Sequence, residues 1–380
     1  MRTAKRTAAV LVAAFAVFLF GFAASLADRL LNPTFDAPIA TSTTAAALHA
    51  SLRVVDLHAD SLVWERSLAE RGTTGHVDVP RLIEGHVALQ VLALPTKSPL
   101  GQNFERTEDG WIDQITVLGV AQLWPLDAWT SLEARAHLHA AELAALDAER
   151  DDLFVVRNVQ DLDRVGEGGV AALLAIEGAH CLEGDVEAVD RLFAAGFRMF
   201  GLTHFFDNEL GGSAHGVDKG GLTDFGRAVV ERMEALSIVV DLAHASPAVI
   251  DDVLDVVKRP VVVSHTGVRG VCDNDRNLTD AQLFRIRDNG GVIGIGFWPA
   301  AVCGDDAAAI AKSIAYVADR IGADHVALGS DYDGAVGVPF DASGMEALTH
   351  ALLERGMDDE TIAKIMGENT LRVLRASLPN

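Results

Sequence analysis

The chain has 380 residues, of which 49% are hydrophobic and 22% charged, a composition typical of a packed globular protein and not of a disordered or fibrous one. Its formal net charge of −23 at pH 7 argues against nucleic acid or anionic lipid as a nonspecific partner, because both would repel it. The three cysteines, Cys181, Cys272 and Cys303, lack the spacing of a thiolate metal site or a redox motif. One disulfide is open to them, but we expect all three to be reduced, buried packing residues.

The first thirty residues differ from the rest of the chain. Basic residues precede an apolar run at 8–27, which has about the length of a bilayer-spanning helix and exceeds a usual signal peptide's apolar core. Ser25 and Ala27 are small enough to form a cleavage site. Residues 1–30 are therefore predicted to be a membrane anchor or a removed signal peptide. Either would place the rest of the chain in the periplasm or outside the cell, with membrane contact through this segment if it is retained.

Residues 31–50 are interpreted as a linker, and residues 51–380 as one domain in which apolar strands alternate with amphipathic helices. Strands are predicted at 52–57, 87–94, 170–176, 197–203, 237–243, 259–264, 291–297 and 325–330. Helices are predicted between them at 185–195, 224–235, 247–257 and 279–288. The continuous apolar strands are typical of a parallel sheet that is covered on both faces.

Eight such strands with intervening helices predict a closed (β/α)8 TIM barrel. A doubly wound open sheet is the alternative, but polar residues end many of the strands and not only those at one switch point. The long segment at about 96–150 is interpreted as an insertion after the second strand that caps or flanks the barrel mouth.

Ionisable residues end six of the predicted strands. They are His58 and Asp60, Glu177, His204, His244, His265 and Asp331. Each alone is more readily explained as a hydrogen-bonded structural residue. Together they would converge on the C-terminal rim of a barrel, where burying them is costly unless they pair or bind a metal. Imidazole and carboxylate ligands without thiolate favour zinc, although manganese or cobalt could also fit.

The number of ligands fits two metal ions better than one. His58 and Asp60 could hold one ion, His244 and His265 the other, with Glu177 bridging the two. The sequence therefore predicts a binuclear site at the C-terminal rim, where a hydroxide held between the ions would attack an amide carbonyl.

Two further residues are left for roles other than metal binding. Asp331 could take the proton from the nucleophile and pass it to the leaving amine, and His204 could donate a hydrogen bond to the developing oxyanion. Asp333 lies on the same alternation face as Asp331, so strand parity does not choose between them. The position at the strand end favours Asp331.

The strand-end residues belong to seven motifs that resemble the renal (membrane) dipeptidase family in order and spacing. They are VVDLHAD, AIEGAH, GLTHFFDN, VVDLAHAS, VVVSHTGVRGVCDNDRN, ALGSDYDG and IMGENTLRVL. The resemblance runs from about residue 52 to 375 and has HxD, in place of HxH, after the first strand. It implies a zinc-dependent dipeptidase with two zinc ions per chain, acting as a homodimer on dipeptides and often accepting a D-residue at the C-terminal position.

The resemblance also implies roles for individual residues. The zinc ligands would be His58, Asp60, Glu177, His244 and His265, with the glutamate bridging. His204 would contact the substrate near the scissile carbonyl, and Asp331 would act as the acid and base. Arg276 would bind the substrate's terminal carboxylate, for which a guanidinium has the right charge and fork geometry. The alternative for Arg276 is a surface ion pair with the neighbouring aspartates.

Two other functions stay open at this point. The chain could be a metal-dependent hydrolase of other small amides, lactams or lactones, or a non-enzymatic scaffold with a decayed site. The segment at 96–150 lacks the aromatic-rich stretch that typically follows the second strand in the family, so the preferred dipeptide side chains are not predicted.

Overall fold

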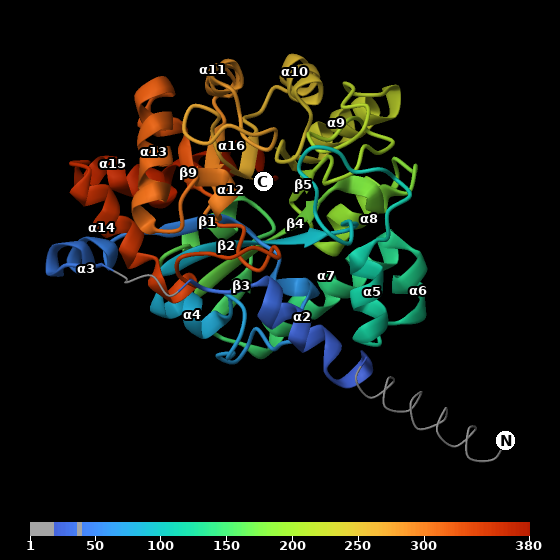
Figure 1. The fold of residues 1–380 in the computed structure, drawn as a ribbon, viewed down its shortest axis with the longest axis horizontal. Coiled ribbons are helices and arrows are strands. Elements are labelled where there is room, and N and C mark those ends of the chain that lie inside the picture. Colours follow the sequence, from blue (N-terminus) through green and yellow to red (C-terminus); the bar gives the residue numbers. More distant parts are fainter. Residues whose placement is uncertain (1–18, 36–39) are drawn as a thin grey trace.

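The computed structural model describes residues 19–35 and 40–380, and its centre is a closed barrel of eight parallel strands (Figure 1). The barrel closes because β2 pairs with β1 on one side and with β4 on the other. This confirms the predicted TIM barrel and excludes the open sheet. The barrel strands are β1 (Val54–Ala59), β2 (Val87–Pro95), β4 (Val170–Glu177), β5 (Met199–Gly201), β6 (Val239–Asp241), β7 (Val262–Thr266), β8 (Val292–Ile295) and β9 (Val326–Leu328).

One additional strand, β3 (Leu153–Val155), was not predicted. It pairs with the first residues of β4, Val170–Ala172, whereas β5 pairs with β4 further along, at Ala175 and Ile176. β3 therefore extends the sheet beside the barrel without taking part in its closure. Three residues give too little periodicity to indicate a strand from sequence alone.

A helix follows each barrel strand, as the (β/α)8 pattern requires (Figure 1). These helices are α4 (Val79–Glu84), α7 (Leu132–Glu149), α8 (Ala188–Ala195), α9 (Asp224–Leu236), α10 (Pro247–Val256), α11 (Asp280–Asn289), α13 (Ala307–Ile321) and α16 (Asn369–Ser377). The further helices are α2 (Ala23–Leu31), α3 (Thr43–His49), α5 (Gln114–Ala121), α6 (Leu126–Thr130), α12 (Pro299–Val302), α14 (Glu346–Glu354) and α15 (Asp359–Ala363). The side chains of Ser246 and Thr279 cap the N-termini of α10 and α11.

The hydrophobic core has two parts, one on each side of the barrel wall. Along β4, Leu173 and Ala175 belong to a cluster to which all eight barrel strands contribute, so this cluster fills the barrel interior. The alternating residues Leu174 and Ile176 pack in a second cluster with the surrounding helices. Both faces of each strand are therefore buried, which explains the continuous apolar runs in the sequence.

A buried carboxylate joins three neighbouring barrel strands. Asp56 on β1 accepts hydrogen bonds from the Ser330 amide (2.8 Å) and hydroxyl (2.7 Å) and from the Gln90 side chain (2.7 Å). We expect Asp56→Ala to lower the free energy of unfolding by about 3 kcal/mol, because these donors would stay buried without an acceptor. Urea unfolding followed by circular dichroism tests this, with the exposed Asp319→Ala on α13 as control. Equal stability of the two variants would contradict it.

The described residues before β1 include the helices α2 and α3, which contact α5 and α14 of the domain. Asp28 in α2 is buried and ion-paired with Arg66 (3.1 Å). His49 in α3 donates a hydrogen bond to the Gly85 carbonyl and forms a second one with the Thr349 hydroxyl. Much of the predicted leader, residues 1–18, lies outside the described residues. Within 19–35 and 40–380, no helix has both the length and the apolar character that a membrane crossing needs.

The expectation of three reduced cysteines is wrong. Cys272 and Cys303 form a disulfide, with their Cα atoms 5.2 Å apart, and only Cys181 is free and buried. The two partners are 31 residues apart in the chain. They follow β7 and β8, which are adjacent in the barrel, and it is this adjacency that brings the two loops together.

Candidate metal centre

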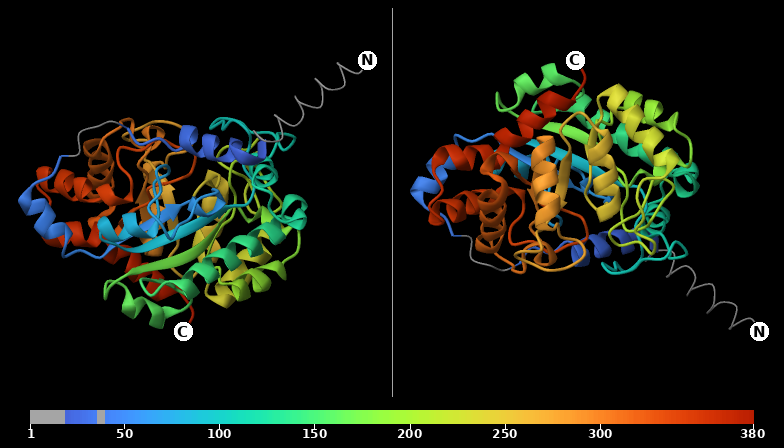
Figure 2. Two further views of the ribbon diagram at one scale, coloured as in Figure 1. Left: turned by 90° about the horizontal axis from the view of Figure 1, so that it is seen from below. Right: turned by 90° about the horizontal axis from the view of Figure 1, so that it is seen from above.

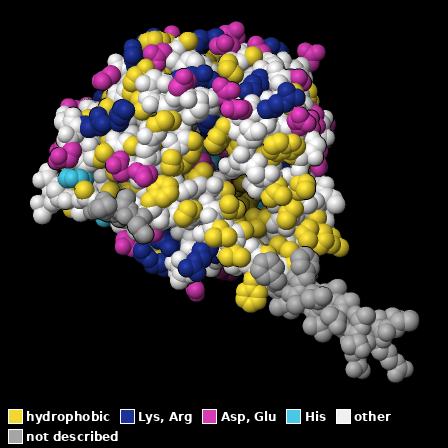
Figure 3. Space-filling view, viewed as in Figure 1, with side chains coloured by type: hydrophobic (Ala, Val, Ile, Leu, Met, Phe, Trp, Pro, Cys, Tyr) yellow, Lys and Arg dark blue, Asp and Glu magenta, His cyan; other side chains and the backbone are white. Residues whose placement is uncertain are grey.

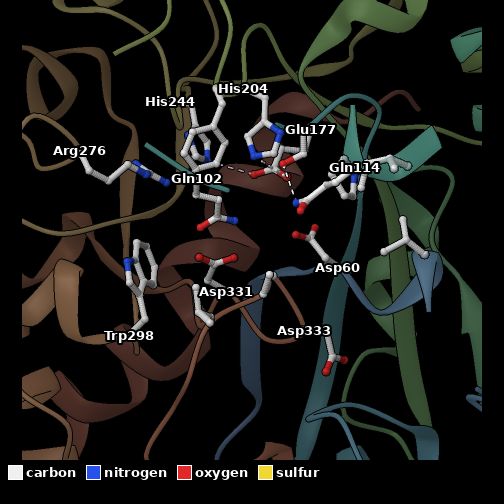
Figure 4. A pocket seen from close by; sticks show the side chains of 18 of the residues that line it. Asp60, Gln102, Gln114, Glu177, His204, His244, Arg276, Trp298, Asp331 and Asp333 are labelled. Atoms are coloured by element: carbon white, nitrogen blue, oxygen red, sulfur yellow. Dashed lines mark hydrogen bonds and ion pairs between the residues drawn. The ribbon is translucent and has the colours of Figure 1, made fainter. Parts of the chain in front are cut away.

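Glu177 lies among the predicted strand-end residues, and Figure 4 shows it close to His204 and His244. Its Oε1 atom is 3.1 Å from His244 Nε2, 3.3 Å from His265 Nε2 and 3.5 Å from His58 Nε2. Its Oε2 atom is 3.4 Å from His204 Nε2. Four imidazoles from four different strand ends thus surround one carboxylate, as the sequence predicted for the C-terminal rim.

The backbone around Glu177 is shaped to let these side chains meet. Gly178 has a φ of +74°, and a Cβ atom there would lie 2.8 Å from the Cβ of His204. Only glycine takes this conformation readily and leaves room for the neighbouring histidine. His244 also has a positive φ, of +60°, three residues beyond the end of β6. This strained position turns its ring toward Glu177.

His58, Asp60 and His265 complete the cluster on the side of β1. The Nε2 atom of His58 lies 3.2 Å from Asp60 Oδ1, and the rings of His58 and His265 have centroids 3.7 Å apart. Strand alternation alone does not place Asp60 on the face of His58, because β1 ends at Ala59 and has a register shift between Asp56 and Ala59. His58 and Asp60 nevertheless point to the same place.

The cluster buries the carboxyl groups of Asp60, Glu177 and Asp331 close together. Burial raises the pKa of Glu177 well above its usual value, and the charge of Asp60 raises it further. Burial by itself would lower the pKa of His58, but the carboxylates of Asp60 and Glu177 reverse this and raise it to about 10. Burial also lowers the pKa values of His244 and His265 well below the usual value, so both rings are neutral. A bound cation would remove the cost of the buried carboxylates.

The donor atoms fit a metal site. His58 Nε2, Asp60 Oδ1 and Glu177 Oε2 are buried and have no hydrogen-bond partner among the described residues. The Nε2 atoms of the neutral His244 and His265 are only 3.0 Å apart. Three sets of ligand atoms lie close enough together to hold an ion. They are His58, Glu177 and His265; Glu177, His204 and His244; and His58, Asp60 and Asp331. Glu177 belongs to two of these sets, so it could bridge two ions.

The surroundings of Asp331 and Asp333 separate the two aspartates that strand parity left equivalent. Asp333 forms an ion pair with Arg66 (2.5 Å) and accepts hydrogen bonds from Ser61 and from the amide of His76. In Figure 4 its side chain points away from the cluster. The Asp331 carboxylate has no hydrogen-bond donor among the described residues, and burial raises its pKa to about 8. Asp331 is therefore the carboxylate that remains available to move a proton.

The orientation of His204 is fixed by the backbone. Its Nδ1 atom donates a hydrogen bond to the carbonyl of Lys97 (3.0 Å), and burial lowers the pKa of the ring well below its usual value. A neutral ring held in this way carries a lone pair at Nε2, toward Glu177. The predicted donation to an oxyanion would therefore require a second proton on the ring.

Arg276 points into the same pocket and is not a surface residue (Figure 4). It is 4% exposed, donates to the carbonyl of His265 (2.6 Å), and has no carboxylate within ion-pair distance in the described part of the chain. Burial lowers its pKa to about 10, so it stays charged at neutral pH. Arg269, and not Arg276, pairs with the aspartates of this loop, Asp273 and Asp275. The surface ion-pair alternative for Arg276 is therefore wrong.

Comparison with known proteins agrees with this site. The model of the membrane dipeptidase family, peptidase family M19, matches residues 42–378. The chain belongs to this family. It is 29% identical over 338 residues to "Dipeptidase tcpJ" of Claviceps purpurea, covering 85% of this chain and 74% of that protein. The chain is thus a metallo-dipeptidase, a peptide hydrolase.

Two solved structures of metallopeptidases are similar to the M19 dipeptidase described here. One is the M19 metallopeptidase "dipeptidase AC", with 26% identity and a TM-score of 0.72, covering 87% of this chain and all of that chain. The other is a metallopeptidase from Rhodobacter sphaeroides bound to a phosphinate mimic of the dipeptide L-Ala-D-Ala. It has 26% identity and a TM-score of 0.68, and the match covers 86% of this chain and 99% of that one.

Sequence reasoning missed most of the pocket wall of this M19 dipeptidase. The pocket encloses about 510 Å³ of empty space, counting the part open to solvent. Its wall includes Trp64, Gln102, Phe104, Gln114 and Trp298. Gln102, Phe104 and Gln114 belong to the segment at 96–150, which the sequence placed at the barrel mouth but without assigning residues. No local pattern marks these side chains, because only the path of this long segment brings them to the metal centre.

We expect Arg276→Gln to raise KM for a dipeptide about 10–100-fold, which corresponds to the loss of a charged hydrogen bond. The same substitution is expected to leave KM for the corresponding dipeptide amide unchanged, because the amide has no carboxylate to bind. Steady-state kinetics on the pair of substrates measures this. Lys219→Gln is a control, since Lys219 pairs with Asp275 at the surface. An equal rise of KM for dipeptide and amide would contradict carboxylate binding.

Proposed function

We propose that this metallo-dipeptidase binds two zinc ions and hydrolyses the peptide bond of dipeptides, with tolerance for a D-residue at the C-terminal position. The observation that carries the proposal is the buried Glu177 carboxylate with imidazoles on both sides and unpartnered ligand atoms around it. His58 and Asp60 would hold one ion and His244 and His265 the other, with Glu177 between them. Zinc suits these imidazole and carboxylate ligands.

The residues around the ligands support a mechanism for peptide-bond hydrolysis. When bound, the two ions would supply a hydroxide nucleophile at neutral pH and polarise the amide carbonyl. Arg276 would hold the C-terminal carboxylate, which fixes the position of the scissile bond in the pocket. Asp331 would take the proton from the nucleophile and donate it to the nitrogen of the leaving amino acid. His204 would contact the substrate beside the scissile carbonyl.

Tolerance for a C-terminal D-residue is supported by one related protein. The R. sphaeroides metallopeptidase binds a mimic of L-Ala-D-Ala, and its chain matches almost completely. In the present protein a carboxylate bound to Arg276 would place the C-terminal side chain near Trp298, whose ring is 5.6 Å from the guanidinium. Dipeptides with C-terminal D-residues are therefore proposed as substrates alongside the L-forms.

Amino-acid release from a dipeptide panel, including C-terminal D-residues, tests the function. We expect activity to vanish after chelation and to return when zinc is added, because the cluster needs cations for both charge balance and the nucleophile. The control is the chelated and re-dialysed protein without added metal. Absence of release despite about two bound zinc ions per chain would favour another small amide, a lactam or a lactone as the substrate.

Export of the domain to the periplasm or the cell exterior is also proposed. The Cys272–Cys303 disulfide supports it, because disulfides persist mainly in oxidising compartments outside the cytoplasm. The homodimer remains a prediction from the family resemblance.

A further inference from the structure

Exposed large hydrophobic side chains gather in two segments of the chain. Of the fourteen such residues in the described part of the chain, eleven lie within 20–31 or 100–126. They are Phe20, Phe22, Leu26, Leu30, Leu31, Leu100, Trp111, Ile112, Val117, Leu123 and Leu126, which we call the apolar patch. The two segments meet in space, since α2 contacts α5 and both views of Figure 2 place them side by side. In Figure 3 hydrophobic atoms gather at the corresponding lower right of the molecule.

The helix α2 exposes large apolar side chains that an ordinary surface helix would bury. It buries the charged Asp28, which is 4% exposed and bound by Arg66, Asn32 and Thr74. Phe22, which precedes α2, and Leu26 and Leu30 within it are exposed instead, and the exposed Arg29 lies beside Leu30. A helix in contact with water normally buries its apolar stripe and exposes its charges. The exposed apolar side chains of α2 therefore fit an apolar environment, and the Asp28–Arg66 ion pair fixes the helix in this orientation.

The chain that precedes the patch indicates what covers it. Residues 1–18 contain basic residues followed by the first part of the apolar run. The described chain begins at Leu19, directly before Phe20, the first residue of the apolar patch. The patch is thus continuous in sequence with a segment of membrane-spanning composition. Large exposed apolar patches mark interaction sites, and this continuity selects a lipid bilayer over another protein.

We propose that the apolar patch docks on a lipid bilayer, with α2 and the α5–α6 region lying in its surface. The side chains of an interfacial surface of this kind reach about 5–10 Å into the boundary between headgroups and acyl chains. Glu105, Arg106, Glu108 and Asp109 are exposed between the patch residues Leu100 and Trp111, and their net negative charge favours zwitterionic over anionic lipid. Gln102 and Gln114 of the same region line the active-site pocket, so substrate would enter beside the membrane.

Depth-dependent quenching in the full-length chain tests this docking separately from anchoring by the N-terminal residues. A fluorophore would be attached to Ile112→Cys or Leu123→Cys, both 61% exposed, and to Phe284→Cys on α11 as the matched control away from the patch. Labelling is selective because Cys181 is buried and the other two cysteines are paired. The labelled proteins, checked for intact fold by dipeptidase activity, would be reconstituted into phosphatidylcholine vesicles that contain lipid with a nitroxide at a shallow acyl position.

We expect the nitroxide to quench most of the fluorescence at positions 112 and 123 and little of it at position 284. Equally weak quenching at all three positions would overturn the proposal and leave the patch in water. Weak quenching combined with self-quenching between labels at position 112 would also overturn it, and would assign the patch to contact between two copies of the chain.

Discussion

Replacing Asp331 with asparagine is expected to lower kcat for dipeptides by about 10²–10⁴-fold, the usual contribution of a positioned acid or base. The substitution keeps the size of the side chain but removes its capacity to carry a proton. Asp331 is buried, faces the metal centre and has no competing hydrogen-bond donor in the described part of the chain. KM is expected to change little, since Arg276 and the pocket wall would bind the substrate.

The matched control for this substitution is Asp333→Asn, two residues further along. Asp333 is tied to Arg66, Ser61 and His76, so its loss is expected to reduce thermal stability and to change kcat only a few-fold. Metal content of both variants would be measured, because Asp331 also lies near His58 and Asp60. If Asp333→Asn reduced kcat as much as Asp331→Asn, the assignment of the proton carrier would be wrong. A loss of metal in Asp331→Asn would instead identify Asp331 as a ligand.

Replacing Glu177 with alanine is expected to abolish both metal retention and turnover. Glu177 Oε1 lies within 3.5 Å of three histidine Nε2 atoms, so both proposed ions depend on it. Loss of the metals would remove several kcal/mol of transition-state stabilisation, a reduction in rate of about 10³-fold or more. Metal per chain, measured by elemental analysis after dialysis, and dipeptide turnover are the two readouts.

The matched control is Glu187→Ala, an exposed glutamate ten residues further along the chain. It is expected to keep both metal and activity. Circular dichroism would show whether Glu177→Ala is folded, which is expected because removing a buried carboxylate also removes its desolvation cost. A folded and fully active Glu177→Ala protein would refute the binuclear arrangement.

Much of the site could be predicted because, in a barrel of parallel strands, a residue's place at the end of a strand determines where it lies in the fold. Parallel strands all end at the same rim, so a residue that closes an apolar run is placed near every other such residue. His58, Glu177, His204 and His265 follow this rule and meet within hydrogen-bond or ion-pair distance. His204 and His244 each lie three residues beyond the end of their strands, and His244 in addition takes a positive φ, which the sequence does not reveal.

The features that could not be predicted depend on contacts between distant parts of the chain. The disulfide forms because the loops after β7 and β8 are neighbours. Arg276 is buried at the metal centre, and it is Arg269 that binds the nearby aspartates. The N-terminal residues were interpreted as a leader and linker from their composition. In the structure, Asp28 and His49 are bound by residues on the barrel, which no local pattern indicates.

The sequence by itself determined the alternation of strands and helices, the barrel and the set of strand-end residues, because apolar periodicity and strand-end placement are local properties of the chain. The tertiary structure decided which of two equivalent aspartates is free. Strand parity treats Asp331 and Asp333 alike, but Arg66, which lies in the segment between β1 and α4, pairs with Asp333 and leaves Asp331 facing the metal centre. Such a choice depends on partners far away in sequence, and only the folded chain brings those partners together.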